Sequence, residues 1–145
     1  MTTISAVDAP PDVVAFLDRV GEALDAIFRG DHRPYAALWA HDDDVTLFGA
    51  WGPIEQGHEG VTRTFAWVGS RFSDGLMEPY EYRVITVSGD LGYTVGFERG
   101  TVRVDGGPPT PMALRVTHGF RRIDGAWRLT HRHADFPPVD QRTTS

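Results

Sequence analysis

The sequence predicts an α+β fold, in which a curved antiparallel sheet wraps around N-terminal helices. Two observations predict it. Apolar residues recur at helical spacing through most of the first half of the chain, whereas from Tyr80 onward they alternate with polar ones. Helices followed by a run of strands are typical of this class, because the helices cover one face of the sheet.

Three helical segments are expected in the first half. The first begins at Pro10-Pro11-Asp12, since proline suits a first turn whose N–H groups lack partners. Its apolar stripe continues to Phe28, and Gly30 can supply the left-handed residue that ends it. The expected helices are residues 12–28, 31–39 and 57–72, the last of them closed by Ser73-Asp74-Gly75.

The second half reads as strands joined by tight turns. Asp90, Asp105-Gly106-Gly107 and Asp124-Gly125 separate the alternating segments at hairpin spacing. A short strand at 45–49 and a turn at 50–53 precede the third helix. The longer strands are expected at Tyr80–Val87, Leu91–Val104, Met112–Arg122 and Trp127–Phe136. A sheet bent over helices encloses a concavity, where function is expected.

Length and composition restrict the class of protein. A chain of 145 residues suggests one domain, with residues 1–9 and 137–145 as loose tails. The absence of cysteine excludes disulfides, thiolate nucleophiles and zinc–cysteine sites, and fits a cytoplasmic location. No signal peptide and no membrane-spanning run is apparent. With a net charge of −6 and no basic tract, we expect neither nucleic acid nor membrane as a partner.

The hairpin at Gly106-Gly107 indicates which residues face the concavity. If those glycines form the loop, Phe97 opposes Val116, and Arg99 opposes Leu114. This mostly apolar set, which also includes Tyr93, Val95 and Phe120, is expected inside, and His118 lies with it. Glu98 then opposes Arg115 on the other face, as an exposed ion pair.

The register of the last strand stays open. A loop of Asp124-Gly125 alone places His131 and His133 beside His118. A loop of Ile123-Asp124-Gly125 with a glycine bulge instead directs Thr130 and Arg132 inward. One residue of register exchanges every side chain of the strand between the two faces.

Several segments are similar to SnoaL-like proteins, over roughly residues 12 to 136. This resemblance implies the nuclear transport factor 2-like (cystatin-like) fold, a cone-shaped α+β barrel shared by ketosteroid isomerases, polyketide cyclases, limonene epoxide hydrolases and the calmodulin-dependent kinase hub domain. It also implies a homodimer. The segments that carry it are Gly30-Asp31, His41–Gly49, Gly57–Val61, Leu114–Thr117 and Arg121–Asp135.

The catalytic residues of these relatives match poorly. The isomerase base would fall near Gly49, and residues 45–52 hold no carboxylate. Of the arginine–aspartate pair of the epoxide hydrolase only Arg99 is present, and its last-strand aspartate is replaced by Arg132. The kinase hub lines its pocket with arginines, two of whose positions resemble Arg99 and His118. That likeness favours the longer loop, with Arg132 facing inward.

Arg99, His118 and Arg132 therefore form a candidate basic pocket for an anionic or carbonyl oxygen, because a guanidinium pairs with two oxygens at once. The alternative is that both arginines extend to the rim and His118 is a hydrogen-bonded core residue. The side chains expected to line the pocket are Trp39, Trp51, Phe97, Leu114 and Val116.

The predicted function is binding of a small hydrophobic ligand, with isomerase, cyclase or dehydratase activity on it. His118 or His131 would carry the proton, because imidazole titrates near neutral pH. The alternative is a non-catalytic dimerising or ligand-sensing module. His131, His133 and Asp135 are potential metal ligands on one side of a strand, but further ligands would have to come from elsewhere in the chain. The alternative is a polar stripe at a dimer face. We expect no metal and no cofactor.

Overall fold

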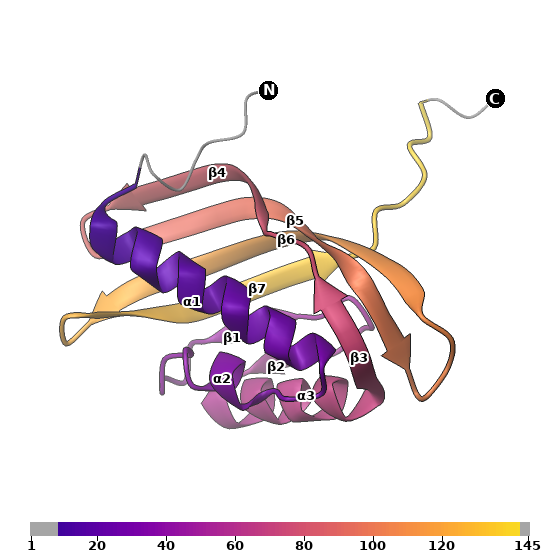
Figure 1. Cartoon of the computed structure of the whole chain (residues 1–145). Coiled ribbons are helices and arrows are strands. Elements are labelled where there is room, and N and C mark those ends of the chain that lie inside the picture. Colours follow the sequence, from indigo (N-terminus) through magenta and orange to yellow (C-terminus); the bar gives the residue numbers. More distant parts are fainter. Residues whose placement is uncertain (1–8, 143–145) are drawn as a thin grey trace.

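The computed structural model describes residues 9–142, which fold into one curved sheet with helices against its concave side (Figure 1). The helices are α1 (Pro11–Phe28), α2 (Arg33–Ala36) and α3 (His58–Arg71). The strands are β1 (Thr46–Phe48), β2 (Ile54–Gln56), β3 (Phe72–Met77), β4 (Glu81–Ser88), β5 (Leu91–Val104), β6 (Thr110–Ile123) and β7 (Ala126–Asp135). The observed architecture confirms the predicted α+β class.

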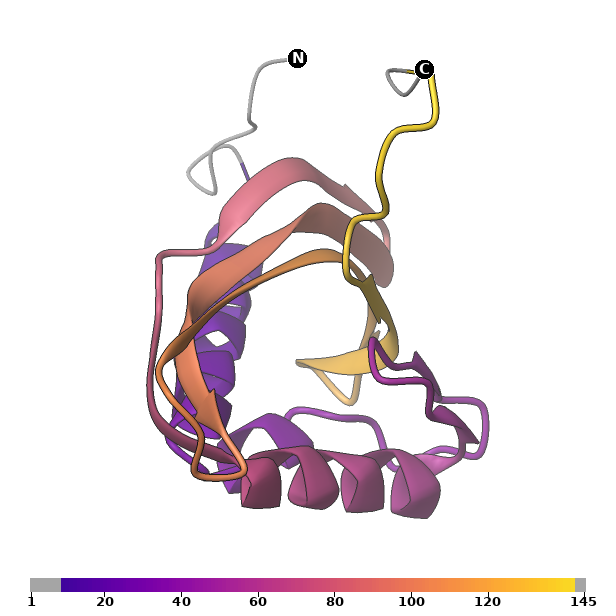
Figure 2. The same cartoon turned by 90° about the vertical axis from the view of Figure 1, so that its right-hand side faces the viewer.

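The sheet order is β2-β1-β7-β6-β5-β3, with β4 also paired to β5. All pairings are antiparallel except that of β1 with β7. The long strand β5 pairs with β4 through its first part and with β3 through its last, so the sheet bends along it. Figure 2 shows the resulting curl of the sheet around an interior closed on one side by α1 and below by α3.

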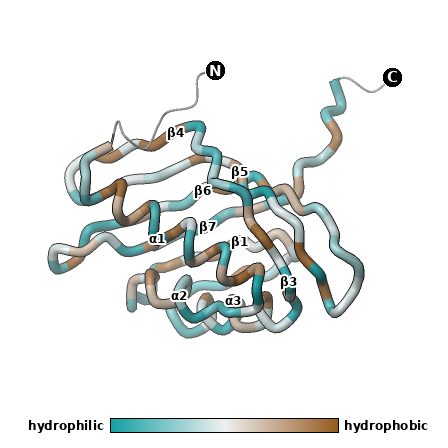
Figure 3. The backbone as a smooth tube through the Cα atoms, in the orientation of Figure 1, coloured by the Kyte–Doolittle hydropathy of each residue, from teal (hydrophilic) through white to brown (hydrophobic). Residues whose placement is uncertain are grey.

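Helix α1 supplies one wall of the core. Its apolar residues lie at helical spacing and are buried against the sheet, as amphipathic periodicity requires. Figure 3 shows hydrophobic and hydrophilic residues following one another along α1 and the strands. Trp39, Tyr35 and Phe65 pack together beneath this helix, with Trp39 and Tyr35 almost fully buried. Aromatic rings therefore fill part of the interior.

Two local features differ from the sequence-based expectation: one prediction was wrong and one strand was missed. Ser73-Asp74-Gly75 does not end the chain's third helix in a loop but lies inside strand β3. This strand is irregular, because its pairing with β5 shifts between Ser73 and Leu76 and Asp74 has φ of +51°. A side chain at Gly75 would lie 2.3 Å from the backbone oxygen of Phe28, so glycine allows the strand to contact α1. Strand β2 was not predicted.

The register of the β5–β6 hairpin also differs from the prediction. Glu98 opposes Leu114, and Phe97 opposes Arg115, a shift of one position along the strand. Residues 105 and 106 form the turn, and residues 107–109 follow it before β6 begins, so the connection is longer than a Gly106-Gly107 loop. The shift exchanges the faces of β5, and Glu98 points inward.

On β7 the inward position of Arg132 is confirmed, but it does not result from the predicted loop of three residues. The turn is the short Asp124-Gly125 loop, since Ile123 pairs with Ala126. The pairing then shifts between Gly119 and Phe120, which leaves Thr130 as an extra residue on β7. Beyond this bulge, Arg132 rather than His131 lies opposite His118.

Residues 137–142 contain neither helix nor strand, while the rest of the expected tails, residues 1–8 and 143–145, lies outside the described residues. Within the described chain, no helix combines the length and apolar character needed to cross a bilayer.

Candidate functional site

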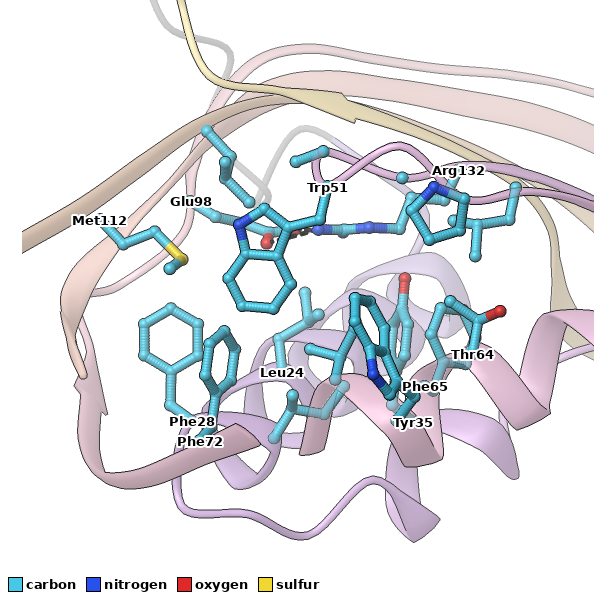
Figure 4. Close-up of a pocket in the computed structure, with 18 of the residues that line it drawn as sticks. Leu24, Phe28, Tyr35, Trp51, Thr64, Phe65, Phe72, Glu98, Met112 and Arg132 are labelled. Carbon is cyan, nitrogen blue, oxygen red and sulfur yellow. Dashed lines mark hydrogen bonds and ion pairs between the residues drawn. The ribbon is translucent and has the colours of Figure 1, made fainter. Parts of the chain in front are cut away.

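A partly open cavity with a volume of about 80 Å³ lies between α1, α3, the β1–β2 loop and the inner face of the sheet (Figure 4). Its wall is almost entirely apolar. The exceptions among side chains are Glu98, Arg132, Tyr35 and Thr64, and the Thr64 hydroxyl already donates to the Gly60 carbonyl. The apolar side chains that line it are Leu24, Ile27, Phe28, Leu47, Ala50, Trp51, Pro53, Phe65, Trp67, Val68, Phe72, Met112, Leu114 and Phe136.

Glu98 and Arg132 form a buried ion pair at the polar end of this cavity (Figure 4). Arg132 Nη1 donates to Glu98 Oε2 at 2.6 Å, and Nη2 donates to Oε1 at 2.9 Å. The side chains are only 2% (Glu98) and 11% (Arg132) exposed. Burial alone would lower the pKa of Arg132, but the charge of Glu98 outweighs that effect and raises it. Arg132 therefore keeps its charge, and its counter-ion is the carboxylate of Glu98.

His118 and Tyr35 extend the network behind the ion pair. His118 Nε2 lies 2.6 Å from the Tyr35 hydroxyl and 3.3 Å from Arg132 Nη1. Because a guanidinium can only donate, Nε2 accepts, and Tyr35 donates to it. Burial lowers the pKa of His118 well below its usual value, and the charge of Arg132 lowers it further. Burial also raises the pKa of Tyr35. Both groups are thus neutral near pH 7.

Trp51 lies in the loop between β1 and β2, and its contacts hold this loop against the cavity. Its ring packs edge-on against Trp67 and Phe72, with centroid distances of 5.8 and 5.3 Å. The guanidinium carbon of Arg71 lies 4.2 Å from the centroid of the Trp51 ring, and Arg71 Nη2 donates to Asp105 Oδ2 at 3.0 Å. One arginine therefore joins the loop, the end of α3 and the β5–β6 turn.

The predicted pocket residues separate into four groups, the last of which lies on the outer face of the sheet. Trp51, Leu114 and Arg132 line the cavity. Val116 and His118 are buried on the same face of β6, behind the cavity wall, and Trp39 belongs to the aromatic core.

Phe97 and Arg99 are corrections to the predicted pocket. Because of the shifted register they lie on the outer face of the sheet, where Arg99 Nη1 donates to Glu81 Oε1 at 2.6 Å. The Arg99 guanidinium carbon lies 4.4 Å from the centroid of the Phe97 ring. The structure thus does not assemble a pocket from Arg99, His118 and Arg132 together.

His131, the other candidate proton carrier, points away from the cavity. Its Nδ1 lies 2.8 Å from Thr46 Oγ1, and its ring packs edge-on against Phe48. Burial lowers its pKa. His133 is exposed beside Phe48, and Asp135 accepts from Arg115, so the described residues contain no group of histidines and acids that could hold a metal ion.

Glu98 and Tyr35 are the polar cavity residues whose role the sequence did not reveal. Glu98 was expected outside because Tyr93, Val95 and Phe97 form the more apolar set of β5. The inward set instead contains Thr94, Glu98 and glycines. Glycines in a strand indicate close approach of another segment, and this was the available signal that the Glu98 side of the strand faces the packed interior.

Comparison with solved structures identifies the class of fold. The described fold matches a nuclear transport factor 2-like superfamily protein from Salmonella enterica serovar Typhimurium with a TM-score of 0.75 at 17% identity, over 92% of this chain and 94% of that one. It matches a nuclear transport factor 2-like protein from Pseudomonas putida with a TM-score of 0.67 at 22% identity, over 99% and 95%. A cystatin-like protein from Nostoc punctiforme gives 0.62 at 21%, over 97% and 99%.

Comparison of the sequence with family models assigns the chain to one family. Residues 17–138 match the model of the SnoaL-like domain, and the chain belongs to that family. No curated protein sequence matches it significantly. The resemblance to SnoaL-like proteins and the cone-shaped fold that it implied are therefore confirmed.

Proposed function

We propose that the chain binds a small, uncharged and mostly apolar molecule in the cavity, with the polar end of that molecule against Glu98 and Arg132. The observation that carries the proposal is the composition of the wall. Apolar side chains form nearly all of it, and one ion pair supplies the polar groups at a single end. Sites for small molecules commonly combine an apolar wall with few polar groups that fix orientation.

The ion pair favours an uncharged ligand over an anion. Glu98 already neutralises Arg132, His118 is neutral, and Arg99 is on the other face of the sheet. A carboxylate placed against Arg132 would lie close to the negative charge of Glu98 in a poorly solvated cavity, where like charges repel strongly. A carbonyl, hydroxyl or amide group meets no such penalty.

The test is a titration followed by two-dimensional NMR with two probes of similar size, cyclopentanone and cyclopentanecarboxylate. Cyclopentanone should shift the methyl signals of Leu24 and Leu114, and the carboxylate should bind at least tenfold more weakly. Leu114→Phe should abolish binding by filling the cavity, whereas Leu91→Phe, at an exposed position, should not change it. Unchanged methyl signals with cyclopentanone would contradict the proposal.

A second function, proton transfer on the bound molecule, is favoured by one observation: the Glu98 carboxylate faces the cavity. His118 lies behind Arg132 and Tyr35, and His131 faces away, so among these candidates only Glu98 reaches a ligand. An enzyme of this kind would accelerate deuterium exchange of the α-protons of cyclopentanone in heavy water, and Glu98→Gln would remove the acceleration. Exchange no faster than in buffer would indicate a binding module.

A further inference from the structure

The ion pair at the polar end of the cavity retains hydrogen-bonding capacity on both partners. Arg132 Nη2 carries two hydrogens, and within residues 9–142 it donates only to Glu98 Oε1. Oε1 in turn has a lone pair beyond the one that Nη2 uses. A buried donor and a buried acceptor that stay unused are costly, so a partner for them is expected.

Within residues 9–142 no other side chain makes a hydrogen bond with Arg132 Nη2 or Glu98 Oε1, and the buried Tyr80 hydroxyl near them also lacks a partner. The Tyr35 hydroxyl donates to His118, and the Thr64 hydroxyl donates to the backbone. The remaining side chains of the cavity wall are apolar, apart from the indoles of Trp51 and Trp67, which pack against each other. Because Glu98 and Arg132 both line the cavity, a ligand bound in it can reach these two groups.

The two unused groups are neighbours. Arg132 Nη2 and Glu98 Oε1 are 2.9 Å apart. The free hydrogen of Nη2 and the free lone pair of Oε1 therefore lie on the same edge of the planar ion pair. A ligand that satisfies both must present an acceptor and a donor next to each other, without charge. A ketone satisfies only the arginine, and an ether or ester likewise lacks the donor.

We infer that the molecule bound here carries an uncharged amide, as in a lactam or carboxamide, with its carbonyl oxygen accepting from Arg132 and its N–H donating to Glu98. This inference rests on the proposed function and narrows its ligand class. The amide group is planar, like the guanidinium–carboxylate pair, and its oxygen and nitrogen are spaced to contact both partners at once. The rest of the ligand contacts the apolar wall.

The test compares 2-pyrrolidinone with cyclopentanone and cyclopentane, three rings of nearly the same size, by NMR titration of the full chain. In a purely apolar cavity the lactam binds more weakly than the ketone, because burying an unpaired amide is costly. We expect the opposite order, with the lactam bound at least tenfold more tightly, and with shifts of the Glu98 Cδ signal that cyclopentane does not cause.

The outcomes separate the two claims. If cyclopentanone binds as tightly as the lactam or more tightly, the amide inference is wrong and the proposed apolar site stands. If none of the three rings shifts any cavity signal, the proposed function fails and the inference fails with it.

A variant adds an independent measurement. Glu98→Gln should reduce the preference for the lactam at least fivefold, whereas Glu59→Gln, the same change at an exposed helix residue, should leave it unaltered. A folded Glu98→Gln protein that keeps the full preference overturns the assignment of Glu98 as acceptor. If this variant does not fold, the order of the wild-type affinities and the Glu98 Cδ shift decide the question.

Discussion

Glu98 and Arg132 show how two residues define the polar end of the cavity. Removing two charges from water costs several kcal/mol for each ion, and their attraction repays this only with good geometry. The bidentate contact supplies that geometry. The pair is therefore better explained by a role in the site than by a contribution to stability, since apolar residues of similar volume would serve the core as well.

We predict that breaking the pair on one side is far more harmful than replacing both partners. Glu98→Gln leaves the Arg132 charge buried without its counter-ion and should lower the free energy of unfolding by about 3–5 kcal/mol. The double variant Glu98→Leu, Arg132→Met should lose less than about 1 kcal/mol, or gain stability. Urea unfolding measures both.

The control for this prediction is an ion pair at the surface. Asp90 and Arg122 are 2.9 Å apart with side chains 69% and 39% exposed, and Asp90→Asn should cost less than about 1 kcal/mol. Equal losses for Glu98→Gln and Asp90→Asn would show that the buried position of Glu98 has no energetic consequence.

His118 should make stability depend on pH. Its pKa in the folded protein lies well below the value of 6.5 that it has when unfolded, because burial disfavours the charged form. Below pH 6.5 the unfolded chain therefore takes up a proton that the folded chain does not. The free energy of unfolding should fall by about 1.4 kcal/mol per pH unit as the pH drops below 6.5, and the contribution is constant above it.

The measurement compares wild type with His118→Gln, whose amide oxygen can accept in place of Nε2, in urea unfolding at pH 7.5 and 5.5. Carboxylates titrate equally in both proteins, so the difference isolates His118. An identical pH dependence in the two proteins would contradict the depressed pKa.

At the scale of the elements, the bend of β5 depends on glycine. A Cβ atom at Gly96 would lie 2.3 Å from the Glu81 carbonyl oxygen and 2.9 Å from the Tyr80 ring. This is the region in which the pairing of β4 with β5 shifts, between Tyr82 and Val84. The glycine therefore lets the two strands approach at the irregularity and the sheet curve over α1.

We predict opposite effects for two glycine-to-alanine changes. Gly96→Ala forces two backbones apart and should reduce the free energy of unfolding by at least about 2 kcal/mol. Gly21→Ala, in the middle of α1 with no atom within 4 Å of the added methyl group, should increase it by about 0.5–1 kcal/mol. Thermal unfolding followed by circular dichroism tests both, and a neutral Gly96→Ala would show that the strands can separate freely.

Helix α1 and strands β5 and β7 show which parts of the fold and of the site could be predicted from the sequence. Helix α1 was predictable because a single apolar stripe determines which face is buried. The face of β5 was not, because its apolar set, Tyr93, Val95 and Phe97, lies outside, and glycine, threonine and Glu98 lie inside. The bulge at Thr130 leaves no mark in the residue pattern, yet it alone directs Arg132 rather than His131 into the cone.

At the scale of the whole molecule, the outer face of the sheet carries a group of apolar side chains among charged ones. We define it as Arg83, Val84, Tyr93, Val95, Phe97, Arg115, Thr117 and His133. Tyr93 is 46% exposed, and the guanidinium carbons of Arg83 and Arg99 lie 5.1 and 4.4 Å from the centroid of the Phe97 ring. An antiparallel sheet with one solvated face normally alternates apolar residues inward and polar residues outward. On β5 that order is reversed, which indicates that something covers this face.

We predict that a second copy of the chain covers the outer face and makes a homodimer. The face carries carboxylates, Glu81 and Asp135, beside its arginines, so two copies related by a two-fold axis can pair opposite charges around the apolar centre. Sedimentation velocity at micromolar concentrations should show a dimer, and Val95→Glu should convert it to a folded monomer. Ile54→Glu, at a residue 76% exposed on β2, should leave the dimer intact. A wild-type protein that sediments as a monomer throughout this range would refute the prediction and leave the reversed pattern of β5 to another partner.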